Sequence, residues 1–347
     1  MEAKGVKVSI IIPVYQVAPY IGDCLRSVMR QTYTGSMECL LVDDCGGDDS
    51  MAIAEEMIRD YEENLPQRQK GRGIQFRIFH HEVNRGLSAA RNTGTLEAVG
   101  EYLYYLDSDD EITDRCIEIL MQRMMEDPDI EMVQGNVCSH LMNAKTAVAV
   151  KKVVLPLASN QEEVRSCFYQ YRQINVNVWN KLLKRSVILD NSILCKEGLL
   201  FEDQLWIFYL MKYVKKAACV ADITYHYKRR PQSIVTGTDE PTKGYHLSIV
   251  FHEILNHLTP GHEQEECDYY ARRIASTYVK YVRIVPEYKK VLQLCREKCK
   301  TYGSRSSRWI LAVSHVLGNR YGKFIWDGLL WVRRMVKRLY RDVICLG

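Results

Sequence analysis

Long hydrophobic runs are absent from this 347-residue sequence. No stretch reaches the roughly 18 apolar residues that mark a membrane-spanning helix. The apolar run that begins at Val6 is too short for the hydrophobic region of a signal sequence, and Pro13 interrupts it. We therefore expect a chain that works in the cytoplasm and does not cross a membrane.

An excess of charge of one sign is also missing, because 47 Lys and Arg residues against 43 Asp and Glu residues leave a net charge of only +4. A general affinity for nucleic acid is therefore not expected. Positive charge collects near the C-terminus, where Asp327 is the one acid between Arg305 and Asp342. The apolar residues of 309–317 and 324–339 recur at helical spacing. Such basic amphipathic helices can lie on an anionic membrane surface, or dock on the protein with a solvated basic face.

Twelve cysteines are present, but the Cys-x-x-Cys pairs of structural zinc sites are not. Cys295 and Cys299 share a helical face without a second pair near them in the sequence. We interpret the cysteines as reduced thiols of a cytosolic protein.

The first part of the sequence alternates between strand and helix patterns. Short apolar, β-branched runs alternate with segments whose apolar residues have helical spacing. The expected order is strand 6–14, helix 21–29, strand 39–42, helix 48–61, strand 74–79, helix 87–99 and strand 102–106. This pattern predicts an α/β fold whose parallel sheet is covered by helices on both faces.

Polar residues follow three of these strands: Tyr15, the pair Asp43 and Asp44, and the segment 107–110. Ligands of such sheets bind beyond the carboxyl ends of the strands. We therefore expect the three polar segments to lie near one another.

Beyond Asp114 the regular alternation is lost. The patterns predict a helix at 114–126, strands at 130–138 and 146–155, and a strand at 217–227. Further helices are expected at 160–172, 179–188 and 204–215. Gly, Thr, Asp and Pro in 236–244 indicate a linker, and the rest of the chain is expected to be helical.

The acidic segment after the fourth strand is the strongest candidate for a metal site. Asp107 and Asp109 are two residues apart, so their carboxylates can converge. Hard oxygen ligands suit Mg²⁺ or Mn²⁺, which also bind substrate phosphates. The alternative is a solvated turn in which Asp110 or Thr113 caps the next helix.

Four segments in this order carry a resemblance to a known family: VSIIIPVYQVAPYIGDCLRSVMRQTY, ECLLVDDCGGDD, NRGLSAARNTG and YLYYLDSDDEIT. Together they resemble the family 2 glycosyltransferases, and WNKLLKR, FEDQLW and YHYKRRPQSIV extend the match. The resemblance covers roughly residues 6–235. It implies a Rossmann-like GT-A domain over 1–235, with a donor nucleotide half at 1–115, an acceptor half at 116–235, and an α-helical extension at 236–347.

The resemblance also implies roles for individual residues. The nucleotide would contact Pro13, Tyr15, Asp44, Asn84, Arg91, Asp107 and Ser108, and the metal would be held by Asp107, Asp109 and His226. Asp44 would accept from the uracil imide N–H, since a carboxylate only accepts. Asp203 would be the catalytic base, with Glu202 as its rival. Cys45-Gly46 departs from the family pattern, which has Ser or Thr two residues after the Asp pair.

Several of the candidate residues, and Trp179 and Arg230 beside them, also have a purely structural interpretation. Asp203 could be an acid favoured by a helix N-terminus. His226 could be a hydrogen-bonded histidine at a strand end, and Arg91 a helix arginine paired with an acid. Trp179 could line the acceptor pocket or pack in the core, and Arg230, with its neighbour Arg229, could hold phosphate or be solvated.

The expected function is the Mn²⁺- or Mg²⁺-dependent transfer of a sugar from a nucleoside diphosphate sugar, a UDP-sugar above all. The resemblance implies a saccharide or lipid-linked acceptor, inversion at the anomeric carbon, and a role in bacterial surface polysaccharide synthesis at the cytoplasmic face of the inner membrane. A non-catalytic scaffold that binds nucleotide sugars is the main alternative. A nucleotidyltransferase would need a basic, glycine-rich loop after the first strand, and a dehydrogenase would need GxGxxG there; neither is present.

Overall fold

The computed structural model describes residues 7–64, 73–141, 147–151, 157–230, 233 and 237–320. The chain divides into two compact units, Met1–Thr236 and Gly237–Gly347. We describe each unit by itself. The expected division of the first unit into donor and acceptor halves stays a prediction.

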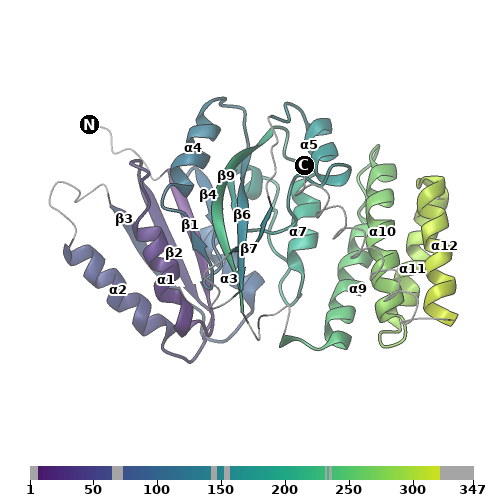
Figure 1. Cartoon of the computed structure of the whole chain (residues 1–347), viewed down its shortest axis with the longest axis horizontal. Helices are drawn as coiled ribbons and strands as arrows, with labels where there is room; N and C mark the ends of the chain where they lie inside the picture. The colour runs from purple at the N-terminus through teal and green to yellow at the C-terminus, as the bar shows by residue number, and fades with distance from the viewer. Residues whose placement is uncertain are drawn as a thin grey trace, which may run out of the picture. The chain divides into compact units, whose positions relative to one another are not determined.

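The first unit is built on one mixed sheet (Figure 1). Its strands are β1 (Val8–Val14), β2 (Met37–Asp43), β3 (Ile74–His80), β4 (Tyr102–Tyr105), β5 (Glu111–Ile112), β6 (Met132–Leu141), β7 (Ala147–Lys151), β8 (Lys181–Lys184) and β9 (Ala217–Arg229). Its helices are α1 (Ala18–Met29), α2 (Ser50–Asn64), α3 (Leu87–Glu97), α4 (Cys116–Met125), α5 (Gln161–Tyr169), α6 (Arg185–Leu189) and α7 (Glu202–Leu210). The sheet order is β3-β2-β1-β4-β8-β6-β9-β5, with β7 paired to β6.

The expected alternation up to the fourth strand is confirmed, and β3, β2, β1 and β4 run parallel. Every residue of β1 is buried, as a parallel strand covered on both faces requires. Ile10 and Ile12 belong to a core with apolar residues of α1, α2 and α4. Ile11 points to the opposite face, where α3 packs on it at Gly94. On the side of α3, Tyr105 of β4 meets Trp206 of α7 edge to face, with ring centroids 6.1 Å apart.

The structure differs in three places from the expectations for the second half of the sheet. Residues 179–188 form strand β8 and helix α6 instead of one helix, because β8 pairs antiparallel with both β4 and β6 and buries Leu182 and Leu183. The helix expected at 204–215 spans only α7, and the two-residue strand β5 was not expected. A short apolar run fits either a buried strand or a helix, so only its partners decide.

The linker expected at 236–244 was also largely wrong, because helix α9 begins at Glu240. The side chain of Asp239 accepts from the backbone N–H of Thr242, and Pro241 lies in the first turn. Asp239 and Pro241 therefore mark the capped start of a helix. From composition alone, the same residues had indicated a loop.

Gly94 allows helix α3 to approach the sheet, and it carries the first testable prediction. A Cβ at this position would lie 2.4 Å from Cγ2 of Ile11. Gly94→Ala should therefore lower the free energy of unfolding by about 1–3 kcal/mol, although Ala has a higher helix propensity than Gly at an exposed position. Urea denaturation measures this. The exposed Leu96→Ala on the same helix is the control, with an effect below about 0.5 kcal/mol; a stabilised Gly94→Ala protein would contradict the packing argument.

The described part of the second unit is helical, as expected. It consists of α9 (Glu240–Asn256), α10 (Glu263–Tyr281), α11 (Glu287–Thr301) and α12 (Arg305–Arg320), and α10 contacts each of the other three (Figure 1). Cys295 and Cys299 are buried free thiols. None of the described helices is both long and apolar enough to cross a membrane. The basic amphipathic segment expected at 324–339 lies outside the described residues.

Candidate functional site

The ends of three parallel strands bring the predicted polar segments together, as expected. β1 pairs with β2 on one side and with β4 on the other. Across these pairs Asp44 N–H donates to the carbonyl of Val14 at 2.9 Å, and Leu106 N–H donates to that of Ile11 at 3.0 Å. The loops that carry Tyr15, Asp44 and Asp107 therefore leave the same edge of the sheet.

Asp44 holds the loop between β3 and α3. Its carboxylate is buried and accepts from the backbone N–H groups of Arg85 at 2.9 Å and Gly86 at 2.7 Å. The ring of His81 joins Asp44 at 2.7 Å to the Thr93 hydroxyl at 2.9 Å. A carboxylate has about four acceptor positions. Three are used here, and the side chain is only 3% exposed, so the predicted contact with a uracil imide N–H stays a prediction.

The other predicted nucleotide contacts of the first half surround this loop. Tyr15 and Asn84 are exposed beyond β1 and β3. Pro13 is buried within β1 opposite Val42, so its side chain supports the strand end. Their contacts with a nucleotide stay predictions.

The acidic segment after β4 forms a turn in which Asp110 N–H donates to the carbonyl of Asp107 at 3.0 Å. Ser108 is buried in the turn. The side chains of Asp107 and Asp109 are 23% and 20% exposed, so both can be reached from solvent. Asp109 pairs with Arg230, whose guanidinium lies over the ring of Tyr20. Arg230 is therefore paired with the acidic segment in this structure, and its phosphate contact stays a prediction.

The acidic segment also fits a hard divalent cation. Burial, and then the charge of Asp107, raise the pKa of Asp109, and burial raises that of Asp110 well above its ordinary value. Each of the two accessible carboxylates is paired with an arginine in this structure, Asp107 with Arg91 and Asp109 with Arg230, so a cation between them stays a prediction. The accessible oxygens of Asp107 and Asp109 are the ligand type that Mn²⁺ and Mg²⁺ prefer.

Arg91 joins the acidic segment to helix α7. Its Nη2 donates to Asp107 at 2.6 Å and its Nη1 donates to Glu202, the first residue of α7. Burial works against the charged form, but the carboxylates of Asp107 and Glu202 prevail and raise the pKa of Arg91. A second link lies next to it, where the side-chain amide of Asn92 exchanges two 2.8 Å hydrogen bonds with the backbone of Cys195.

This bridge separates the roles of the two acids that begin α7. Glu202 is buried and occupied by Arg91. Asp203 is half-buried, and its Oδ1 accepts from the backbone N–H of Gln204 at 2.8 Å. Phe201, which precedes them, has a φ of 62°, a conformation that bulky residues rarely adopt. Of the two candidates for the base, Asp203 is the more exposed to solvent.

The structure does not bring His226 to the other predicted metal ligands. Tyr225 faces the acidic segment, because its hydroxyl donates to Asp110 at 2.8 Å and accepts from Asp107 N–H at 3.3 Å. Side chains alternate along a strand, so His226 faces the other side of β9. There its Nδ1 lies 3.0 Å from Nε2 of His140.

Trp179 stacks on Tyr225 and Tyr227, with centroids 4.3 and 5.7 Å apart and rings nearly parallel. Trp179 and Tyr227 pack against the apolar core from half-buried positions. The packing interpretation of Trp179 is thus observed, and a contact with the acceptor stays a prediction.

The sequence reasoning missed His81, Asp110 and Tyr225 as organisers of the site. Side chains alternate along a strand, so the sequence Tyr225-His226-Tyr227 could have indicated that the two tyrosines share one face of β9.

Tyr225→Phe is the second testable prediction, because it removes the hydroxyl that bonds both Asp110 and the Asp107 backbone. We expect a loss of about 1–3 kcal/mol in the free energy of unfolding, since Asp110 loses a buried partner. Urea denaturation measures the loss, and Tyr227→Phe on the same face is the matched control. Equal losses for the two substitutions would show that the hydrogen bonds of the Tyr225 hydroxyl do not stabilise the fold more than the Tyr227 hydroxyl does.

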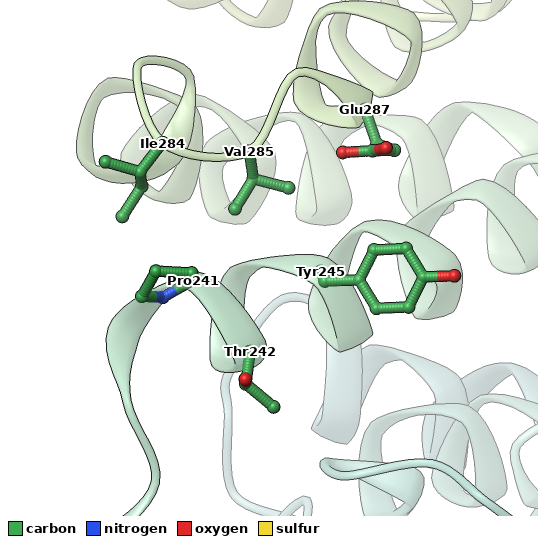
Figure 2. Close-up of a pocket in the computed structure, with 6 residues that line it drawn as sticks. All are labelled: Pro241, Thr242, Tyr245, Ile284, Val285 and Glu287. Carbon is green, nitrogen blue, oxygen red and sulfur yellow. The ribbon is translucent and has the colours of Figure 1, made fainter.

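A separate pocket of about 290 Å³ lies within the second unit (Figure 2). Figure 2 shows its lining, which combines the start of α9 with the turn between α10 and α11: Pro241, Thr242, Tyr245, Ile284, Val285 and Glu287. It contains none of the predicted site residues, and a single carboxylate among mainly apolar groups offers no catalytic arrangement.

Structural comparison supports the fold. S. aureus TarS (residues 1–349) in complex with UDP has a TM-score of 0.64 and 19% identity, covering 90% of this chain and 87% of that chain. The mannosyltransferase PcManGT from Pyrobaculum calidifontis, in complex with GDP-Man and Mn²⁺, has a TM-score of 0.55 and 15% identity, covering 96% and 87%. The predicted GT-A fold with C-terminal helices is confirmed.

Sequence comparison identifies the family. The uncharacterized glycosyltransferase EpsJ of Bacillus subtilis (strain 168) is 28% identical over 250 residues, which cover 69% of this chain and 66% of EpsJ. The match thus spans just under two thirds of that relative's length. A sequence model described as glycosyl transferase family 2 matches residues 9–180. The chain carrying this strand-end site therefore belongs to glycosyltransferase family 2.

Proposed function

We propose that this protein transfers a sugar from a nucleoside diphosphate sugar, a UDP-sugar above all, to a hydroxyl of a saccharide or lipid-linked saccharide, with inversion. The UDP bound to TarS and the GDP-Man and Mn²⁺ bound to PcManGT support a donor of this class. A role in surface polysaccharide synthesis follows from the family resemblance.

The observation that carries the proposal is the bridge from Asp107 through Arg91 to Glu202. It connects the carboxylates that suit a phosphate-bound cation to the helix that bears Asp203. Donor and acceptor must be aligned across the anomeric carbon, and a rigid link between the two parts of the site provides this.

The residues would divide the chemistry as follows. A divalent cation held by Asp107 and Asp109 would neutralise charge on the leaving nucleoside diphosphate. Asp203 would take the proton of the attacking hydroxyl, which is a poor nucleophile without a base. Asp44 would orient the base of the nucleotide, and Arg230 would leave Asp109 and hold a phosphate instead.

Calorimetry with UDP, in the presence and absence of Mn²⁺, tests the donor site. We expect Mn²⁺ to strengthen UDP binding and Asp109→Asn to weaken it at least about tenfold, because a metal ligand is lost. Asp114→Asn, at an exposed acid just beyond β5, is the matched control and should bind as the wild type does.

Other outcomes would correct the proposal. Binding of GDP in place of UDP would leave the site in position but contradict the uracil role of Asp44. Failure of every nucleotide to bind, with and without metal, would contradict the donor site itself. Nucleotide binding without any turnover of a panel of UDP-sugars would favour the scaffold alternative.

A further inference from the structure

A second group of metal-ligand side chains lies on the opposite face of β9 from the acidic segment, where His226 is the register partner of Glu111. Potential ligand atoms of Cys138, His140 and His226 all lie within 4.8 Å of one another. Nε2 of His140 and Nδ1 of His226 are 3.0 Å apart, and their ring centroids are 5.1 Å apart. Cys138 is buried, whereas the two histidines are partly exposed, so an ion from solvent can reach the group.

The backbone explains why these three side chains meet. β6 and β9 run parallel, and Cys138 is the register partner of His226. His140 is two residues beyond Cys138 on β6, which places both on one face of the strand. The convergence thus follows from the strand register as well as from the individual side-chain positions.

We propose that Cys138, His140 and His226 form a Zn²⁺ site that is distinct from the cation site of the acidic segment. A thiolate with two imidazoles is a donor set that Zn²⁺ prefers, whereas carboxylates suit Mn²⁺ and Mg²⁺. On binding, the Cys138 thiol would release its proton to solvent and a thiolate–zinc bond would form. Three protein ligands leave the fourth tetrahedral position for water or another ligand.

The location separates this site from the donor site. Tyr225 bonds the acidic segment from one side of β9, and His226 is on the other. Zn²⁺ here would fasten β6 to β9 near their C-terminal ends. The proposed transferase activity does not depend on this inference, and the inference does not depend on the activity.

The same geometry can also be interpreted without a metal ion. Two neutral imidazoles can share one hydrogen bond beside a buried thiol without binding any ion. Spectroscopy distinguishes the two interpretations. Co²⁺, which can replace Zn²⁺ as a probe, would show a thiolate-to-metal absorption band only if the three ligands bind it together.

The test is titration of metal-free full-length protein with Co²⁺ in the absence of nucleotide, followed by displacement with Zn²⁺. We expect a thiolate-to-cobalt charge-transfer band and the visible bands of a tetrahedral ion, saturating at one ion per chain. Cys138→Ser should abolish the charge-transfer band. His140→Gln should weaken Zn²⁺ affinity at least about tenfold, and Zn²⁺ should raise the melting temperature of the wild type but not that of Cys138→Ser.

Two controls make the outcome decisive. Cys219→Ser, at an equally buried thiol on β9, should keep the charge-transfer band. Asp109→Asn should also keep it, because the acidic segment is a different site. The proposal is overturned if wild-type protein shows no charge-transfer band, if Cys138→Ser leaves the band unchanged, or if Asp109→Asn removes it. Loss of UDP–Mn²⁺ binding in His140→Gln would also overturn the separation of the two sites.

Discussion

Replacing Asp203 by Asn is expected to reduce the rate of sugar transfer by about 10²–10⁴-fold while leaving UDP–Mn²⁺ affinity within about twofold of the wild type. Asn has nearly the shape of Asp but cannot accept the proton of the attacking hydroxyl. Oδ1 can still accept from Gln204 N–H, so the start of α7 should persist. Turnover of the donor found by screening UDP-sugars, together with UDP calorimetry, separates the two effects.

The matched control is Glu162→Gln, at an exposed acid in the first turn of α5. It removes a helix-start charge without touching the site, so turnover should stay unchanged. Should Asp203→Asn keep more than about half of the wild-type rate, Asp203 is not the base. Glu202→Gln then becomes the next variant, although Arg91 occupies Glu202.

Arg91→Met should lower the free energy of unfolding by about 3–5 kcal/mol, the largest stability effect that we expect. The substitution keeps an apolar stem but leaves Glu202 buried, and Asp107 largely so, without the shared cation. Arg91→Lys should recover only part of the loss, because an ammonium lacks the planar fork that bonds two carboxylates at once. Urea denaturation is the measurement.

Arg85→Met provides the comparison for Arg91. Arg85 pairs with Glu197 near the same helix, but both side chains are almost half exposed. A surface pair contributes about 0–1 kcal/mol, so the two arginines should differ by several-fold. Similar losses for both would contradict the buried bridge. In a double mutant, Glu202→Gln should remove part of the cost of Arg91→Met, since the charge left unpaired is then gone.

Much of the fold of the first 115 residues could be predicted from local patterns alone. Periodicity and the positions of Asp43, Asp44, Asp107 and Asp109 after strands predicted the alternating elements and the polar sheet edge. These features repeat every two or 3.6 residues, or lie directly at strand ends, so a short window of sequence contains them. The metal site at Asp107 and Asp109 followed from their spacing and chemistry, whereas the nucleotide contacts and the metal role of His226 came from the family resemblance; all stay predictions.

Other features depend on contacts between residues far apart in the chain. Residues 181–184 became a strand because β4 and β6 flank them, which overrode a pattern that also suits a helix. Arg91 meets Glu202 across 111 positions, and His140 meets His226 across 86. A short segment of sequence does not indicate which distant side chain will neutralise a buried charge. Local sequence thus determined the alternating elements of residues 6–106 and the chemistry available, whereas tertiary packing decided the strand at 181–184 and which groups meet, since burial makes each unpaired charge costly.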